Sequence, residues 1–161
     1  MIKKIKNDPS FDDVEPLSYL LYQVCSHVHS SMYIEAIKYW DEVGLLMSTF
    51  QKEYDLYLTP STNGCAPLID NTYKTYIDQI KEVHTLPFEE QFHLLIKVFM
   101  PSLQRTPFSQ LANLTGQPAI SLPTYKNKDN MPIGTQFMAP REREDLLLYI
   151  GKILEDEGFF I

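Results

Sequence analysis

Thiol, imidazole and hydroxyl side chains gather between residues 25 and 31, where the chain reads Cys-Ser-His-Val-His-Ser-Ser. Cys25 and His29 are four residues apart, so on a helix they share a face and could form a thiolate–imidazole pair or two metal ligands. His27 and His29, two apart, point away from each other on a helix. No third or fourth ligand follows at a usual spacing, so a small buried thiol beside a rim histidine is the competing interpretation. We expect no metal here.

The remaining reactive side chains are isolated or sit in unpromising surroundings. Ser30–Ser31 has no neighbouring glycine and is typical of a helix junction. His84 and His93 stand alone, as surface or helix-end histidines do. The carboxylates of 142–145 and 155–157 are typical of solvated helix faces. The chain contains no G-x-S-x-G, G-x-G-x-x-G, P-loop or H-E-x-x-H pattern, so its residues alone predict neither a catalytic nor a cofactor-binding site.

The 161 residues suit a single domain, and a content of 44% hydrophobic and 22% charged residues is an ordinary globular composition. A formal net charge of −7 argues against a nucleic-acid binder, and we interpret Lys3, Lys4 and Lys6 as a solvated terminus. No apolar run is long enough to span a membrane or to serve as a secretory signal. We therefore expect Cys25 and Cys65 to be reduced thiols in the cytoplasm.

Apolar periodicity places helices and strands along a single expected domain, 1–161. We predict an N-terminal tail over 1–12, a helical segment over 13–54 and an α/β segment over 55–161. Apolar residues recur at helical spacing in the helical segment, which is either two helices or one helix bent near residues 29–31. Further helices are predicted over 72–83, from Pro87 to Pro101, over 106–116 and from Arg141 onward. Strands are predicted at 55–58, 119–122 and 133–139.

Residues 107–123, Pro-Phe-Ser-Gln-Leu-Ala-Asn-Leu-Thr-Gly-Gln-Pro-Ala-Ile-Ser-Leu-Pro, are punctuated by one glycine and three prolines. Thr106 can cap a helix and Pro107 suits its first turn. Gly116 can take the left-handed conformation that ends a helix, and Pro118 prevents the helix from continuing. The pattern predicts a helix that stops abruptly and leads into a buried strand.

Three blocks of the sequence resemble the end of the amidase signature family. The first is an Asn-x-x-Gly-x-Pro-Ala core followed by a strand that ends in proline; the second is Pro-x-Gly-x-Gln before a last helix; the third is a strand that enters a Thr-Pro loop upstream. In this chain the matching positions are Asn113, Gly116, Pro118, Ala119, Pro123, Pro132, Gly134, Gln136 and Thr59–Pro60. Within the family, Gly-Gln-Pro-Ala-Ile-Ser-Leu-Pro is most similar to the branch of 6-aminohexanoate cyclic dimer hydrolases and aliphatic or aryl amidases.

This resemblance implies an α/β fold in which helices pack on a few strands of a mixed sheet, equivalent to the C-terminal third of the family fold. The implied reaction is hydrolysis of a non-peptide amide through an acyl-serine, without metal or cofactor. In the family a Ser-Ser-Lys set and a glycine-rich oxyanion loop perform it, and both lie upstream of the matching blocks. This chain has six glycines, no two adjacent, so no such loop is present and no catalytic residue can be transferred to it.

The resemblance gives roles to three polar residues. Thr106 lies where family members approach the acyl pocket and is expected to bind substrate; a simple helix cap is the alternative. Asn113 and Gln136 are expected to hydrogen-bond the joints between helices and strands.

Two functions of different class remain open. The chain is either the C-terminal fragment or subunit of an amidase, inactive alone and acting on a small amide only in the complete enzyme, or a non-catalytic binding or scaffold protein that completes a partner or dimerises. An unrecognised site such as Cys25–His29 is a third, weaker reading. Three short strands do not form a self-sufficient sheet, so we expect an exposed edge and a requirement for a missing N-terminal portion or for self-association. No nucleic-acid or membrane partner is expected.

Overall fold

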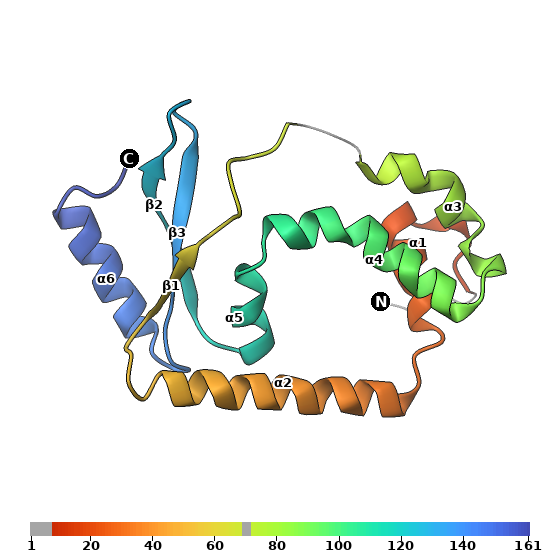
Figure 1. The fold of residues 1–161 in the computed structure, drawn as a ribbon, viewed down its shortest axis with the longest axis horizontal. Coiled ribbons are helices and arrows are strands. Elements are labelled where there is room, and N and C mark those ends of the chain that lie inside the picture. Colours follow the sequence, from red (N-terminus) through yellow and green to blue (C-terminus); the bar gives the residue numbers. More distant parts are fainter. Residues whose placement is uncertain (1–7, 69–71) are drawn as a thin grey trace. The chain divides into compact units, whose positions relative to one another are not determined.

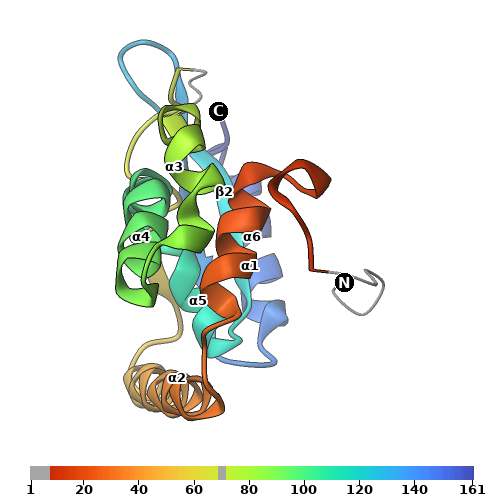
Figure 2. The ribbon, with the colours of Figure 1, turned by 90° about the vertical axis from the view of Figure 1, so that its right-hand side faces the viewer.

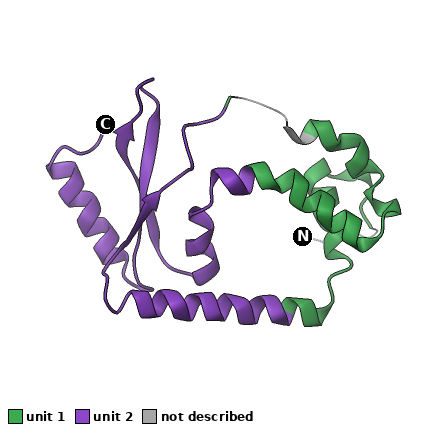
Figure 3. Ribbon diagram, viewed as in Figure 1, with its two compact units in different colours: residues 1–33, 68–101 green, residues 34–67, 102–161 purple. Residues whose placement is uncertain are grey.

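A computed structural model describes residues 8–68 and 72–161 and divides the chain into two compact units (Figure 3). Unit 1 comprises residues 1–33 and 68–101, and unit 2 comprises residues 34–67 and 102–161. Lys3, Lys4 and Lys6 lie outside the described residues.

The described elements alternate between helices and a few short strands (Figure 1). In chain order they are a 3-10 turn Phe11–Asp13, α1 Pro16–Cys25, α2 Ser30–Phe50, β1 Tyr57–Pro60, 3-10 turn Thr72–Tyr76, α3 Ile77–Lys81, 3-10 turn Val83–Thr85, α4 Phe88–Arg105, α5 Ser109–Thr115, β2 Ala119–Lys126, β3 Pro132–Met138 and α6 Glu144–Asp156.

Unit 1 is a helical cluster in which α1, α3 and α4 lie side by side (Figures 1 and 2). Its core consists of residues from all three helices and the turn after α3: Tyr19, Leu20, Val24, Ile80, Val83 and Leu94. Pro16 occupies the first turn of α1, where its missing N–H costs nothing. Upstream, Ser10 donates from its N–H at 2.8 Å and from its hydroxyl at 2.6 Å to the carboxylate of Asp13, which holds the turn before α1.

The structure decides between two open alternatives and corrects one helix prediction. The predicted helical segment 13–54 contains two helices and not one bent helix, because α1 ends at Cys25 and α2 begins at Ser30. The prediction that Pro101 ends a helix is wrong: α4 continues through it to Arg105. A proline ring removes one hydrogen bond, the one to the carbonyl four residues earlier, while the flanking turns keep theirs.

Unit 2 contains a three-stranded antiparallel sheet in the order β1-β3-β2. The register places Leu58, Phe137 and Ile120 on one face of the sheet. Helix α6 covers that face, and its Leu147 packs with Leu122 and Phe137 in the second core. The opposite face is polar, because Thr59, Gln136 and Ser121 share it, and α5 lies on that side (Figure 1).

The end of α5 has the predicted form, but the prediction that a buried strand follows is wrong, because only Leu122 of β2 is buried. Gly116 ends the helix with φ 66°, the left-handed region, and its N–H bonds the carbonyl of Ala112. The strand that follows is longer than predicted, since β2 continues through Pro123 to Lys126. Pro123 is tolerated because its nitrogen faces away from β3, where no ladder hydrogen bond is needed.

Helix α2 has 21 residues and none of them is buried. Its inner side, with Ile37, Met47 and Phe50, is only half-buried. Large apolar side chains on its other side face solvent, including Leu45 at 69% and Leu46 at 70% exposure. Among the described helices, none combines the length and apolar character that a bilayer crossing requires.

Candidate functional site

Thr106 lies directly after α4 and is half-buried. Its hydroxyl donates to the carbonyl of Ser102 at 3.1 Å, and its own carbonyl accepts from the hydroxyl of Ser109 at 3.2 Å. Helix α5 begins at Ser109 with Phe108 at its N-cap position, so Thr106 does not cap the helix that follows. Neither of the two cavities described below is lined by Thr106.

A pair of serine hydroxyls lies on the polar face of the sheet. The Oγ atoms of Ser61 and Ser121 are 2.5 Å apart, and both pass directly over Gly134. Any Cβ at position 134 would lie 2.6 Å from one oxygen and 2.7 Å from the other, so only glycine fits. Among the described residues no histidine or lysine hydrogen-bonds either hydroxyl, and a serine needs such a base to become a nucleophile. The pair therefore fastens β1 to β2 across β3.

The two amides expected at the joints behave differently. The prediction for Gln136 is confirmed: its Nε2 donates to Thr59 Oγ1 at 3.5 Å and to the carbonyl of Phe108 at 3.4 Å, which links the sheet to the start of α5. The prediction for Asn113 is wrong, because its side chain is exposed and makes no hydrogen bond in the described part of the chain.

The α5–β2 joint is instead held by residues that sequence analysis missed. Buried Gln117 accepts from the hydroxyl of Thr115 at 2.8 Å and donates to the side-chain carbonyl of Gln51, the first residue after α2. Arg141 Nε donates to the carbonyl of Thr115 at 2.8 Å, where a cation favourably meets the negative end of α5. Gln51 and Gln117 are 66 residues apart, and Thr115 and Arg141 are 26 residues apart, so no local spacing could reveal these contacts.

The Cys25–His29 pair is not assembled on one helix. Cys25 is the last residue of α1, and the residues after it form a turn in which the N–H of Val28 bonds the carbonyl of Cys25. Both cysteines are free thiols, and the described residues contain no cluster of three or more potential metal ligands. His27 lies against the ring of Phe88, with centroids 5.9 Å apart, as a packing residue.

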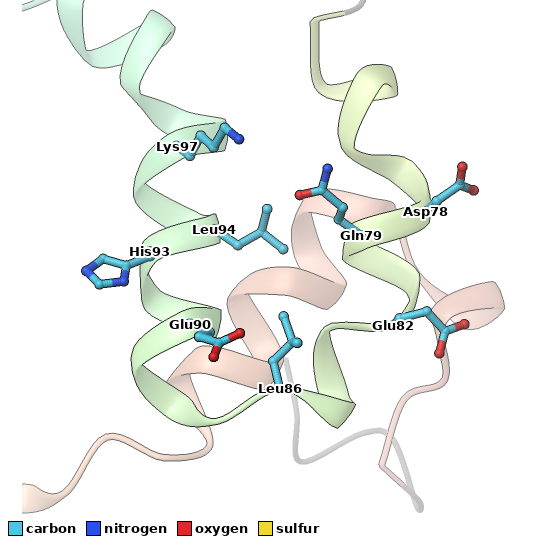
Figure 4. A pocket seen from close by; sticks show the side chains of 8 residues that line it. All are labelled: Asp78, Gln79, Glu82, Leu86, Glu90, His93, Leu94 and Lys97. Atoms are coloured by element: carbon cyan, nitrogen blue, oxygen red, sulfur yellow. The ribbon is translucent and has the colours of Figure 1, made fainter.

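The larger described cavity is a groove of about 630 Å³ in unit 1, between α3 and α4 (Figure 4). Leu86 and Leu94 point into it, while the side chains of Glu82 and His93 point outward at its rim. Lys97 sits at one end, its ammonium 5.2 Å from the centre of the Tyr76 ring. No serine, threonine or cysteine lines the groove, so it can hold an apolar group but supplies no hydroxyl or thiol nucleophile.

A second cavity of about 410 Å³ lies in unit 2, between α2 and the joints before β2 and α6. Its wall is polar, with Asp41 and Ser48 from α2 facing Gln117 and Arg141. The hydrogen bonds of Gln117 and Arg141 described above are structural, and they account for this wall without a ligand.

Shifted pKa values occur away from both cavities. A two-pronged hydrogen bond from Arg143, with distances of 2.8 and 2.9 Å, lowers the pKa of Asp145 and raises the pKa of Arg143. The hydrogen bond to the Asp8 carboxylate raises the pKa of Tyr22. All these groups are exposed, and none of them lines a cavity, so their shifts report surface pairs and not an acid–base centre.

Sequence comparisons show which proteins this chain is similar to. The profile of the family described as Amidase matches residues 1–148. Lipoamidase of Enterococcus faecalis is 33% identical over 159 residues, which is 96% of this chain and 22% of that protein. The 6-aminohexanoate-cyclic-dimer hydrolase of Pseudomonas sp. (strain NK87) is 29% identical over 147 residues, 89% of this chain and 27% of that protein. The chain thus spans about a quarter of the length of these relatives.

The fold gives the same answer. A structure of 6-aminohexanoate cyclic dimer hydrolase complexed with substrate superimposes on 96% of this chain with a TM-score of 0.72 and 27% sequence identity. This chain covers 30% of the hydrolase chain, so most of that fold lies outside the matched part.

Proposed function

Because the chain belongs to the amidase family, we propose that it is the C-terminal fragment or subunit of an amidase that hydrolyses carbon–nitrogen bonds in non-peptide amides. The proposal rests on the extent of the match: 96% of this chain aligns with lipoamidase, but the aligned region is only 22% of the lipoamidase sequence. In the complete enzyme a serine oxygen bonds the acyl carbon, the amine leaves with a proton, and water then hydrolyses the acyl-serine.

The proposal includes inactivity of the chain alone. The Ser-Ser-Lys set expected for the family has no counterpart among its motifs, and the hydroxyls of Ser61 and Ser121 bond each other without a neighbouring base. The chain's own contribution is structural, through the sheet and the joints that hold α5. Thr106, half-buried between α4 and α5, is proposed to line the acyl pocket of the complete enzyme.

The substrate class follows from the named relatives. Because one relative is a lipoamidase and the other a 6-aminohexanoate-cyclic-dimer hydrolase, we propose a small aliphatic amide as the substrate of the complete enzyme. The reaction as proposed needs no cofactor, and we place it in the cytoplasm.

The test combines the chain with the catalytic region that it lacks. Purified 1–161 is assayed with lipoamide and with the cyclic dimer of 6-aminohexanoate, alone and after co-expression with Enterococcus faecalis lipoamidase from which the region similar to this chain has been deleted. We expect turnover only when both polypeptides are present, because neither alone holds a complete site.

The matched control replaces the nucleophilic serine of the lipoamidase part by alanine, which should abolish turnover without preventing association. Turnover by 1–161 alone would overturn the proposed inactivity. Tight association without any turnover would favour the alternative of a non-catalytic scaffold with an amidase-like body.

A further inference from the structure

Helix α4 places a carboxylate, a leucine and an ammonium in one row along the unit 1 groove. Glu90, Leu94 and Lys97 are spaced i, i+4 and i+7, so they share one face of the helix, and all three line the groove. On the facing wall, the amide of Gln79 in α3 is directed into the same space (Figure 4). Along α4 the groove is therefore negative at one end, apolar in the middle and positive at the other end.

The two charges of this row do not neutralise each other. Seven residues separate Glu90 from Lys97, which is about 10 Å along the helix axis. The ion pairs found between described residues involve neither side chain. The ammonium of Lys97 lies instead 5.2 Å from the centre of the Tyr76 ring, an attraction that positions the charge without cancelling it. Both charges are thus available to a ligand.

The space between the charges is apolar and of small-molecule size. Leu94 is buried and Leu86 is half-buried, and both point into the groove (Figure 4). Its volume of about 630 Å³ lies within the ordinary range of small-molecule sites. The other two carboxylates of the wall, Asp78 and Glu82, are directed away from this space. Glu90 therefore supplies the negative charge inside it.

We propose that this groove binds a linear ω-amino carboxylate, an aliphatic chain with an ammonium at one end and a carboxylate at the other. The ammonium meets Glu90, and the methylene chain lies on Leu86 and Leu94. The carboxylate accepts hydrogen bonds from the ammonium of Lys97 and the amide nitrogen of Gln79. Charge complementarity selects this occupant, because an alkylammonium leaves Lys97 without a partner and an alkyl carboxylate leaves Glu90 without one.

This inference concerns unit 1 alone and does not depend on the proposed function. That function would nevertheless supply such a ligand. When a cyclic aliphatic amide is hydrolysed, the hydroxyl of water bonds the acyl carbon and the carbon–nitrogen bond breaks. The nitrogen takes the proton, so one chain then ends in a carboxylate and an amine, and the amine is protonated at neutral pH.

The test titrates unmodified 1–161, at one low protein concentration and neutral pH, with 6-aminohexanoate, hexylammonium and hexanoate, and follows the backbone amide signals by NMR. We expect 6-aminohexanoate to bind about threefold more tightly than either single-ended probe, since an exposed ion pair changes affinity only a few-fold. The shifted signals should belong to the residues of α3 and α4 that line the groove. The shorter 4-aminobutanoate, which cannot reach both charges, should show no such gain.

Two substitutions should have opposite signatures, which a merely structural effect would not produce. Glu90→Gln should weaken binding of 6-aminohexanoate and hexylammonium but not of hexanoate. Lys97→Gln should weaken binding of 6-aminohexanoate and hexanoate but not of hexylammonium. The matched controls are Glu89→Gln and Lys81→Gln, because these exposed neighbours do not line the groove, and they should change no affinity.

Equal affinities for the three probes in the unmodified chain would overturn the proposal, as would signal changes confined to residues outside the groove. Hexylammonium that binds as tightly as 6-aminohexanoate would overturn the role of Lys97 and, with it, the two-ended ligand. Each of these outcomes leaves the proposed function standing, since that is tested by turnover of the two-part enzyme.

Discussion

Gly134 shows how a single missing side chain fixes the geometry of the sheet. With no Cβ in the way, the hydroxyls of Ser61 and Ser121 meet above it and connect the two outer strands through their shared neighbour. The family resemblance picks out Gly134 from the sequence as part of Pro-x-Gly-x-Gln. It does not reveal why glycine is needed, because the two serines lie 60 residues apart from each other.

Gly134→Ala should lower the free energy of unfolding by about 1–3 kcal/mol, because a methyl group there overlaps both hydroxyl oxygens. Chemical denaturation measures the change. Gly44→Ala in α2 is the control: its new Cβ would lie 3.5 Å from Arg141, an ordinary contact, and alanine in a helix interior is expected to stabilise by about 0.5–1 kcal/mol. If Gly134→Ala and wild type have the same free energy of unfolding, the hydroxyls of Ser61 and Ser121 can move apart without destabilising the fold.

At the scale of elements, local signals predict where backbone conformation is restricted and fail where packing decides. Gly116 and Pro118 correctly predict the end of α5, since φ and the missing donor are properties of the residues themselves. The inner face of α4 is predicted only in part: of its apolar stripe, Phe88 and Leu95 do pack against the first core. Its apolar stripe suggests Phe92 and Ile96, yet both are exposed and Gln91 is buried, with its Nε2 bonded to the carbonyl of Leu86 at 2.8 Å.

Helix α2 illustrates the same limit. Its apolar periodicity predicts an inward stripe that includes Tyr33 and Trp40, and the structure leaves both exposed. Periodicity reports that a helix face will be covered, but it does not report which polypeptide covers it. Helix α2 has 21 residues and no buried side chain, and the chain matches only 30% of a longer relative. Such exposure is expected of a helix whose apolar face packs against polypeptide that is not in this chain.

Leu45→Gln combined with Leu46→Gln should therefore leave the Tm of the chain unchanged and reduce its binding of a hydrophobic dye, because both side chains already face water. Differential scanning calorimetry and dye fluorescence provide the two readouts. The control is Leu147→Gln in the second core, where exposure is 4%, which should lower the Tm clearly. A fall in Tm for the α2 double variant as large as for Leu147→Gln would contradict the exposed state of α2.

For the molecule as a whole, the family and the fold class can be predicted from the sequence, because the glycine–proline joints and the strand patterns lie in short, recognisable blocks. The division into two units is not visible in the same way, since each core combines residues from segments far apart along the chain. Thr106 as a pocket residue stays a prediction, since neither of the two described cavities is lined by it.

The purified chain should associate with itself as its concentration rises, because it exposes many large apolar side chains on α2, α4 and α6. Sedimentation velocity over a range of concentrations should show the weight-average mass increasing above that of 18.7 kDa. Addition of the catalytic lipoamidase part should compete with this association. A monomer at every concentration, with no dye binding, would argue that the exposed faces need no cover.

The interleaving of the two units has a practical consequence for dissecting this protein. The backbone passes between them three times, at residues 33–34, 67–68 and 101–102, and two of these passages lie within α2 and α4. The core of unit 1 is built from residues on both sides of unit 2 in the sequence. Residues of α1 (Tyr19, Leu20 and Val24) pack there with residues that follow position 68 (Ile80, Val83 and Leu94). No simple shortening of the gene from either terminus can therefore isolate an intact half.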